Sequence, residues 1–92
     1  MSATRQEVYA AIDSERDYQD RKWGQTESSG KPGVGGARTI DEFASYILGY
    51  AMDLHRISSH ELDPAKKLDF VRKVAGLCVS CMEQHGAPHR SE

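Results

Sequence analysis

The sequence predicts an all-α protein: three helices packed like a bundle, the last two forming an antiparallel hairpin, in an oligomer. Apolar residues recur every three or four positions along most of the chain, and capping residues stand beside each such run. Glycine is concentrated in one segment, and no run alternates as a β-strand does. The 92 residues make one domain, 1–92, and only 38% of them are hydrophobic. So small a core predicts that subunit contacts supplement it.

The first helix is expected over residues 3–23, with Ser2 or Thr4 as its N-cap. Its inward face begins with apolar residues at helical spacing: Val8, Ala11 and Ile12. The same period then reaches polar or amphipathic side chains: Glu15, Gln19, Lys22 and Trp23. Because a buried polar group needs a partner, this change has three explanations. The polar residues form a hydrogen-bond network between helices, emerge into solvent near the end of the helix, or form the wall of a binding pocket.

Residues 24–36 contain five glycines and one proline, which predicts a flexible loop. The segment lacks the G-K-[S/T] ending of a phosphate-binding P-loop, and it follows a helix rather than a strand. Both features argue against a P-loop. A simpler role remains open, in which Lys31 and Arg38 close over an anion and the loop becomes ordered over the ligand.

The second helix is expected over residues 40–57, because Thr39 and Glu42 form a capping box at its start. Apolar residues then repeat with the helical period: Phe43, Ala44, Ile47, Leu48, Ala51 and Leu54. The break after them at Ser58 predicts the turn of the hairpin. This helix is expected to supply one side of the core.

The third helix is expected over residues 63–85, with Asp63 as N-cap and Pro64 in the first turn. Its long apolar stripe consists of Leu68, Val71, Val74, Ala75, Cys78, Cys81 and Met82. Phe70 and Leu77 lie off this stripe, so they predict a second apolar face and a subunit contact through this helix. Gly86 ends the helix, and residues 86–92 form a short tail.

Two cysteines in a C-x-x-C spacing, Cys78 and Cys81, are followed by His85 and His89. A Cys2His2 zinc site is one interpretation. The favoured one is a pair of core thiols, because both cysteines lie on the apolar stripe near the end of a helix. A redox C-x-x-C stands at a helix N-terminus, where the helix dipole stabilises the thiolate. We therefore expect neither a metal nor another cofactor.

A net charge of −2 argues against general nucleic-acid binding, which needs a basic face. The N-terminal residues lack the apolar core of a signal peptide, and no apolar run is long enough for a membrane span. We expect a cytoplasmic protein without a membrane partner, whose thiols are reduced.

The run Glu15-Arg16-Asp17-Tyr18-Gln19-Asp20-Arg21-Lys22-Trp23-Gly24 resembles the opening of small phage and prophage proteins. The run Cys81-Met82-Glu83-Gln84-His85-Gly86 resembles their end. Several of these proteins are loosely similar to the MazG-like all-α nucleoside triphosphate pyrophosphohydrolases. The resemblance implies the cytoplasm of a host cell as location. It also implies a small oligomeric protein of the kind that phages use to sequester host nucleotide immune signals.

The chain departs from the metal-binding pattern of the MazG-like enzymes. Their E-E-x-x-E motif would fall near Tyr46, Ile47 and Tyr50, and their later E-x-x-D near residues 70–73. These positions lack the carboxylates that Mg²⁺ requires. We therefore expect no catalytic residues and favour a binding protein over an enzyme. A pyrophosphohydrolase with ligands from Glu15 and a second subunit stays as an alternative, as does an interaction protein that blocks a host protein.

The predicted ligand is small and nucleotide-like, bound beside the second half of the first helix and facing the other two helices. The residues expected to bind it are Tyr9, Glu15, Arg16, Gln19, Lys22, Trp23, Arg38 and Tyr50. In this arrangement the glutamate and glutamine bind the edges of the base. The basic residues bind phosphate, and the aromatic residues stack on the base.

Overall fold

The computed structural model of the chain describes residues 2–23 and 37–91, and Trp23 only as part of its helix. These residues form three helices: α1 (Arg5–Trp23), α2 (Ile40–Ser58) and α3 (Pro64–His85). No strand occurs in this part of the chain, so the predicted all-α class is confirmed for it. The loop predicted over 24–36, with Lys31 in it, lies outside the described residues.

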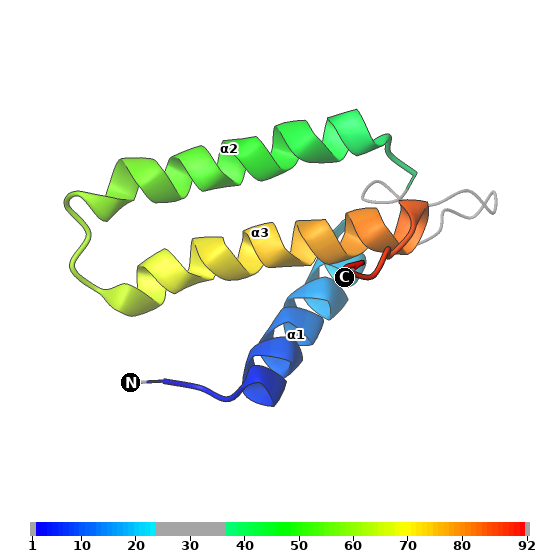
Figure 1. Cartoon of the computed structure of the whole chain (residues 1–92). Coiled ribbons are helices and arrows are strands. Elements are labelled where there is room, and N and C mark those ends of the chain that lie inside the picture. The colour runs from blue at the N-terminus through cyan, green and yellow to red at the C-terminus, as the bar shows by residue number, and fades with distance from the viewer. Residues whose placement is uncertain (1, 24–36, 92) are drawn as a thin grey trace.

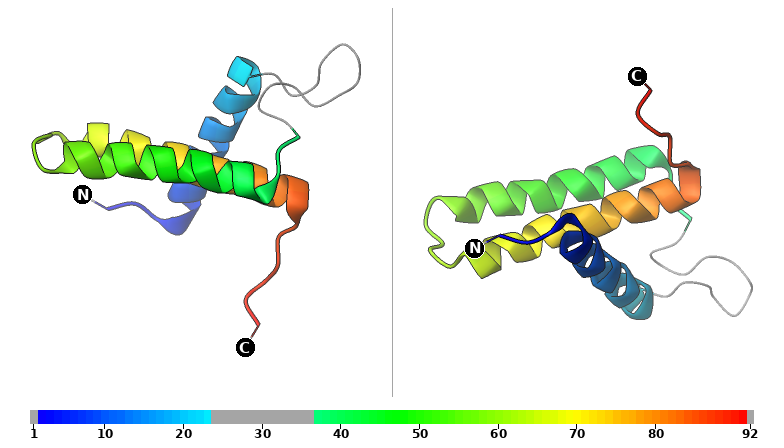
Figure 2. Two further views of the ribbon diagram at one scale, coloured as in Figure 1. Left: turned by 90° about the horizontal axis from the view of Figure 1, so that it is seen from above. Right: turned by 60° about the horizontal axis from the view of Figure 1, so that its bottom comes forward.

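Helix α3 lies between the other two helices. Helix α2 runs beside α3 along its length, while α1 crosses α3 at an angle (Figures 1 and 2). The start of α2 meets the end of α3, where the rings of Phe43 and His85 pack edge to face with centroids 6.3 Å apart. Farther along the pair, the Lys73 ammonium lies 5.8 Å from the centre of the Tyr50 ring. Helix α3 therefore carries every helix-to-helix contact that positions the candidate site.

Capping boxes begin the first two helices. The Glu7 backbone N–H donates to the Thr4 hydroxyl at 3.1 Å, and the Thr4 N–H donates to the Glu7 carboxylate at 3.0 Å. Thr39 and Glu42 make the same reciprocal bonds at 3.0 and 2.9 Å. Each box satisfies backbone donors that a helix start leaves without partners. The cap predicted at Thr39 is confirmed, and of the two candidates for the first helix it is Thr4 rather than Ser2 that makes the capping bonds.

The boundaries of α3 also follow from its caps. The Asp63 carboxylate accepts from the Ala65 backbone N–H at 3.0 Å, with Pro64 at the first helical position. At the other end, Gly86 adopts a φ of 122°, where a side chain would be strained, and its N–H donates to the Met82 carbonyl. Both predicted caps of this helix are confirmed.

Replacing Thr39 by alanine is expected to lower the free energy of unfolding by about 1 kcal/mol, because it removes one half of the capping box. Urea unfolding measures this change. Ser45→Ala is the matched control, since this serine lies exposed inside α2 and its hydroxyl contacts only the Asp41 carbonyl. A loss equal to that of the control would contradict the role given to the cap.

The predicted inward face of α3 is wrong in part. Leu77 is buried with 6% exposure, whereas Leu68, Val71 and Met82 are 59%, 45% and 44% exposed. The other four members of the stripe, Val74, Ala75, Cys78 and Cys81, are half-buried, so the contacts of α3 cover one edge of the stripe and leave the other edge exposed. Leu77 is thus a core residue, and half-buried Phe70 lies 4.9 Å from the Lys73 ammonium. These two residues do not form the free second face expected from their spacing.

The apolar start of α1 is also more exposed than predicted. Val8 is 44% exposed and Ala11 is exposed too, whereas Ile12 is half-buried. Because α1 crosses α3, only a short central part of α1 lies against its neighbour (Figure 2). Burial on α1 therefore reaches its maximum at Glu15 and Gln19, which are polar.

Candidate functional site

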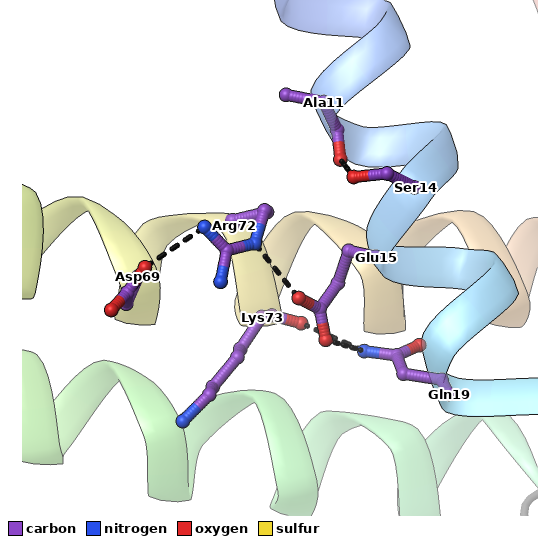
Figure 3. A network of polar contacts seen from close by, with 7 residues as sticks. All are labelled: Ala11, Ser14, Glu15, Gln19, Asp69, Arg72 and Lys73. Carbon is purple, nitrogen blue, oxygen red and sulfur yellow. Dashed lines mark hydrogen bonds and ion pairs between the residues drawn. The ribbon is translucent and has the colours of Figure 1, made fainter. Parts of the chain in front are cut away.

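Two polar side chains of α1, Glu15 and Gln19, lie at its crossing with α3 (Figure 3). They are 5% and 3% exposed, which makes them as buried as the apolar core. Their spacing of four residues puts both on one face of the helix. The Gln19 amide donates to the Glu15 carboxylate at 3.3 Å and to the Lys73 backbone carbonyl at 3.5 Å. Both polar groups thus have partners within the chain.

Arg72 of α3 compensates the buried charge of Glu15. Its Nε donates to the Glu15 carboxylate at 2.9 Å, and its Nη1 donates to Asp69 at the same distance. The hydrogen bond to Glu15 is the main cause that raises the pKa of Arg72 above its ordinary value, against a smaller opposing effect of burial. The carboxylate is therefore part of a charge-assisted contact between the helices.

Gly76 makes this crossing possible. A Cβ atom at Gly76 would lie 2.7 Å from the Gln19 amide nitrogen and 2.8 Å from the Glu15 Cγ. Both distances are shorter than carbon–nitrogen and carbon–carbon van der Waals contacts allow. A glycine inside a helix costs about 1 kcal/mol relative to alanine, and here it provides the space for the polar pair.

A second charged cluster continues the crossing toward the end of α3. The Arg16 guanidinium donates to Glu83 at 2.6 Å and contacts Asp20 at 2.9 Å. Partial burial lowers the pKa of Arg16, but the hydrogen bonds to the two carboxylates outweigh it, so the pKa lies above its ordinary value. Arg16 is thus held by two acids and serves to fix α1 on α3.

The predicted residues of α2 lie on the other side of α3. Half-buried Tyr50 lies beneath the Lys73 ammonium, whose backbone carbonyl accepts from Gln19 on the α1 side. Arg38 precedes α2 and lies over the Tyr46 ring at 5.4 Å, and its carbonyl accepts from the His85 ring at 2.6 Å. Arg38 and Tyr50 therefore do not join the cluster around Glu15, although Lys73 connects the two sides.

The remaining predicted residues lie along α1. Tyr9 is 62% exposed in the first half of the helix. Lys22 is exposed near the end of α1, with its ammonium 5.9 Å from the centre of the Tyr18 ring. Trp23 ends the helix, and its side chain lies outside the described residues. The structure thus brings Glu15 and Gln19 together, with Arg16 next to Glu15 in the same helix but paired with other acids, and leaves Tyr9 and Lys22 apart from them.

Sequence reasoning missed the α3 half of the crossing, which consists of Arg72, Lys73, Gly76 and Glu83. One signal was present, because Gly76 interrupts an otherwise regular helical pattern and a helical glycine often marks a close approach. The partners of Glu15 and Arg16 could not be chosen, since four lysine or arginine residues and two acidic residues of α3 alone compete for them.

The two cysteines are half-buried thiols. Burial, and to a smaller extent the neighbouring Cys81, raises the pKa of the Cys78 thiol. The ring of His85 is engaged by the Arg38 carbonyl. Across residues 2–23 and 37–91, no group of three or more histidine, cysteine, aspartate or glutamate side chains is arranged to hold a metal ion.

No protein-family model, no curated protein and no solved structure matches this chain. Within the described part of the chain, no helix combines the length and apolar character that crossing a membrane requires.

Proposed function

We propose that this chain is a non-catalytic binding protein that sequesters a small nucleotide-like ligand, such as a host immune signal, in the cytoplasm of a phage-infected cell. The observation that carries the proposal is the position of Lys22, whose ammonium lies 5.9 Å from the Tyr18 ring centre on the exposed side of α1. Lys22 forms no ion pair with any residue that the structure describes. Its charge is thus available to a phosphate, next to a ring on which a base can stack.

The crossing of α1 with α3 holds in place the helix that carries Tyr18 and Lys22, but its buried residues do not contact the ligand. Glu15 and Gln19 are satisfied by Arg72 and Lys73, so we assign them a positioning role rather than direct contact with the ligand. The residues proposed to contact the ligand are therefore Lys22 and Tyr18. Arg38 and Tyr50 lie on the α2 side of α3 and Tyr9 lies in the first half of α1, so we no longer assign them to this surface. Arg16 is a weaker candidate for binding phosphate, because two carboxylates already neutralise it.

Calorimetry with a panel of cyclic dinucleotides, cyclic oligonucleotides and ADP-ribose derivatives tests the proposal. We expect at least one member to bind, and we expect Lys22→Ala to weaken its binding about 10- to 100-fold by removing a charge-assisted contact. Tyr18→Ala is expected to weaken it by a similar factor through the loss of stacking.

Lys66→Ala is the matched control for Lys22→Ala. Lys66 is an exposed lysine in the first turn of α3, far along the chain from the proposed surface, and it is paired with Glu61 at 3.8 Å. Its replacement is expected to leave the affinity unchanged. Binding that survives both Lys22→Ala and Tyr18→Ala would place the site elsewhere, and no binding by any member of the panel would refute the proposal.

The second candidate is an interaction protein that blocks a host protein. It is favoured by large apolar side chains exposed on α2 and α3, among them Leu48 at 60% and Leu68 at 59%. Stoichiometric co-purification of one host polypeptide, lost in a Leu48→Asp variant, would favour it over ligand sequestration.

The pyrophosphohydrolase alternative takes ligands from Glu15 and a second subunit, and we rank it behind ligand sequestration because the Glu15 carboxylate is already paired with Arg72. No Mg²⁺-dependent release of pyrophosphate from nucleoside triphosphates is expected.

Within this proposal the α2–α3 pair is an antiparallel hairpin that also provides the contacts of a homo-oligomer.

A further inference from the structure

One side of α3 faces neither α1 nor α2 and carries a regular apolar row. The row consists of Leu68, Val71, Ala75, Cys78 and Met82. Its spacings of three, four, three and four residues are those of a helix that packs against another helix in a coiled coil. Its three largest members, Leu68, Val71 and Met82, are 44–59% exposed, whereas Ala75 and Cys78 are half-buried, so much of the row is left uncovered by the described chain.

Helix α2 has a matching row of exposed residues: Ile40, Ala44, Leu48, Ala51 and Met52. Ile40, Leu48 and Met52 are 57%, 60% and 50% exposed. In each helix, viewed from its own N-terminus, this row lies roughly 100° around the helix axis from the residues that contact the other helix. The direction of the rotation is the same in both helices. Because α2 and α3 run in opposite directions (Figure 1), the two rows form one continuous face, which we call the apolar face.

The row on α3 is nearly symmetric about Ala75. Leu68 and Met82 lie seven residues on either side of it, and Val71 and Cys78 lie four and three residues away. Large side chains thus stand at both ends and a small one in the centre. When two such helices pack antiparallel around a two-fold axis at Ala75, each large side chain meets a large one and the centres approach closely.

The row on α2 has its centre at the same level. Contacts of Phe43 with His85 and of Tyr50 with Lys73 put Leu48 within about one helical turn of Ala75 along the pair. Around Leu48, Ala44 and Ala51 lie four and three residues away, as Val71 and Cys78 do around Ala75. A single two-fold axis therefore serves both helices.

We propose that the apolar face is covered by a second copy of this chain, related by a two-fold axis that passes near Ala75 and Leu48. The product is a four-helix bundle of two α2–α3 pairs, with both copies of α1 on the outside. Self-complementarity of the face selects a second copy rather than an unrelated protein. This inference is independent of the proposed ligand, because α1 contacts α3 on a different side.

The size of the face and the small core of the single chain agree with this assembly. A face of 19 residues and two helix widths measures about 28 by 20 Å, or roughly 560 Å² in projection, near the ~600 Å² per partner of the smallest stable interfaces. Among the described residues, Phe43 and Leu77 are the only large hydrophobic side chains that are buried, with 2% and 6% exposure. A chain with so few buried apolar residues needs its partner whenever it is folded, which is typical of an obligate dimer.

Light scattering or sedimentation of the full chain at micromolar concentration tests the assembly. We expect a dimer of about 20 kDa, twice the 10.2 kDa of one chain, or a larger assembly with an even number of chains. Leu68→Asp and Leu48→Asp are expected to raise the dissociation constant at least about 100-fold, because each would bury an unpaired charge. Leu62→Asp is the control, since Leu62 is 91% exposed between α2 and α3 and should leave the mass unchanged.

Cysteine cross-linking tests the axis without disturbing the fold. In a Cys78→Ala, Cys81→Ala background, an Ala75→Cys variant is expected to form a disulfide-linked dimer under mild oxidation, because the two thiols meet at the axis. Leu68→Cys alone should not, because its two copies lie about 20 Å apart. A mixture of Leu68→Cys and Met82→Cys chains should form a cross-linked heterodimer.

A wild-type chain that stays monomeric at micromolar concentration would overturn the proposal. A dimer that persists in both aspartate variants would also overturn it. So would efficient cross-linking of Leu68→Cys chains to each other when Ala75→Cys chains do not cross-link. Loss of nucleotide binding in a variant that remains dimeric would concern the ligand site alone.

Discussion

Replacing Gly76 by valine is expected to lower the free energy of unfolding by about 2–4 kcal/mol and to detach α1 from α3. The first added carbon would already lie 2.7 Å from the Gln19 amide nitrogen and 2.8 Å from the Glu15 Cγ. Gln19 has a movable end, but the Glu15 side chain is held by Arg72 at 2.9 Å and cannot retreat without breaking that bond. The added side chain therefore disrupts the contact of Glu15 with Arg72, which joins α1 to α3.

Gly49→Ala is the matched control for this substitution. Gly49 also lies inside a helix, but nothing lies within 4 Å of a Cβ built there. Alanine should therefore raise the free energy of unfolding by about 0.5–1 kcal/mol, which is the helix propensity that glycine forfeits. The two glycines thus predict changes of opposite sign.

Urea unfolding at one fixed protein concentration measures both changes, because association would otherwise alter the apparent stability. Hydrogen exchange shows which helices lose protection of their backbone amides. In Gly76→Val we expect the amides of α1 to exchange faster while those of α2 keep their protection. Wild-type protection throughout α1 in this variant would show that the close approach at Gly76 is not what holds the helix.

The ends of the helices could be predicted from the sequence because they depend on local chemistry. Thr39 with Glu42, and Asp63 with Pro64, satisfy backbone groups within a few residues, so no knowledge of the tertiary structure was needed. The same holds for Gly86, whose positive φ follows from its own lack of a side chain.

The inward side of α3 could not be predicted in the same way. Its helix is apolar on more than one side, so periodicity alone does not tell which side the neighbours occupy. The choice depends on where α1 crosses, and this depends on the space at Gly76. Leu68, Val71 and Met82 were therefore assigned to the core although they are exposed, and Leu77 was assigned to a subunit contact although it is buried within the single chain.

The candidate site was predicted on one side only. The α1 period put Glu15 and Gln19 in line with the apolar residues, and the structure shows that both are buried rather than emerging into solvent. Their partners Arg72 and Lys73 lie more than fifty residues away, and several charged residues of α3 have similar spacing. A pairing at such a distance depends on the crossing angle of two helices, which one sequence does not encode in any local pattern.

Replacing Arg72 by methionine is expected to lower the free energy of unfolding by about 2 kcal/mol. The substitution keeps the length of the apolar stem but leaves the Glu15 carboxylate, 5% exposed, without its cation. Breaking a fully buried ion pair costs about 3–5 kcal/mol. The Arg72 side chain is 37% exposed, so water screens part of this contact and the smaller value is expected.

Arg56→Met is the matched control, because Arg56 pairs with Asp53 at 3.0 Å on the surface, with the two side chains 69% and 40% exposed. Its replacement should change the stability by less than about 0.5 kcal/mol. A double-mutant cycle with Glu15→Met then isolates the contact of Glu15 with Arg72, for which we expect a coupling of about 1–2 kcal/mol. Equal losses in Arg72→Met and Arg56→Met, together with no coupling in the cycle, would mean that α1 is held by Gly76 packing and by Arg16 alone. Coupling of the expected size would instead show that a buried charge pair fixes the helix that carries Lys22.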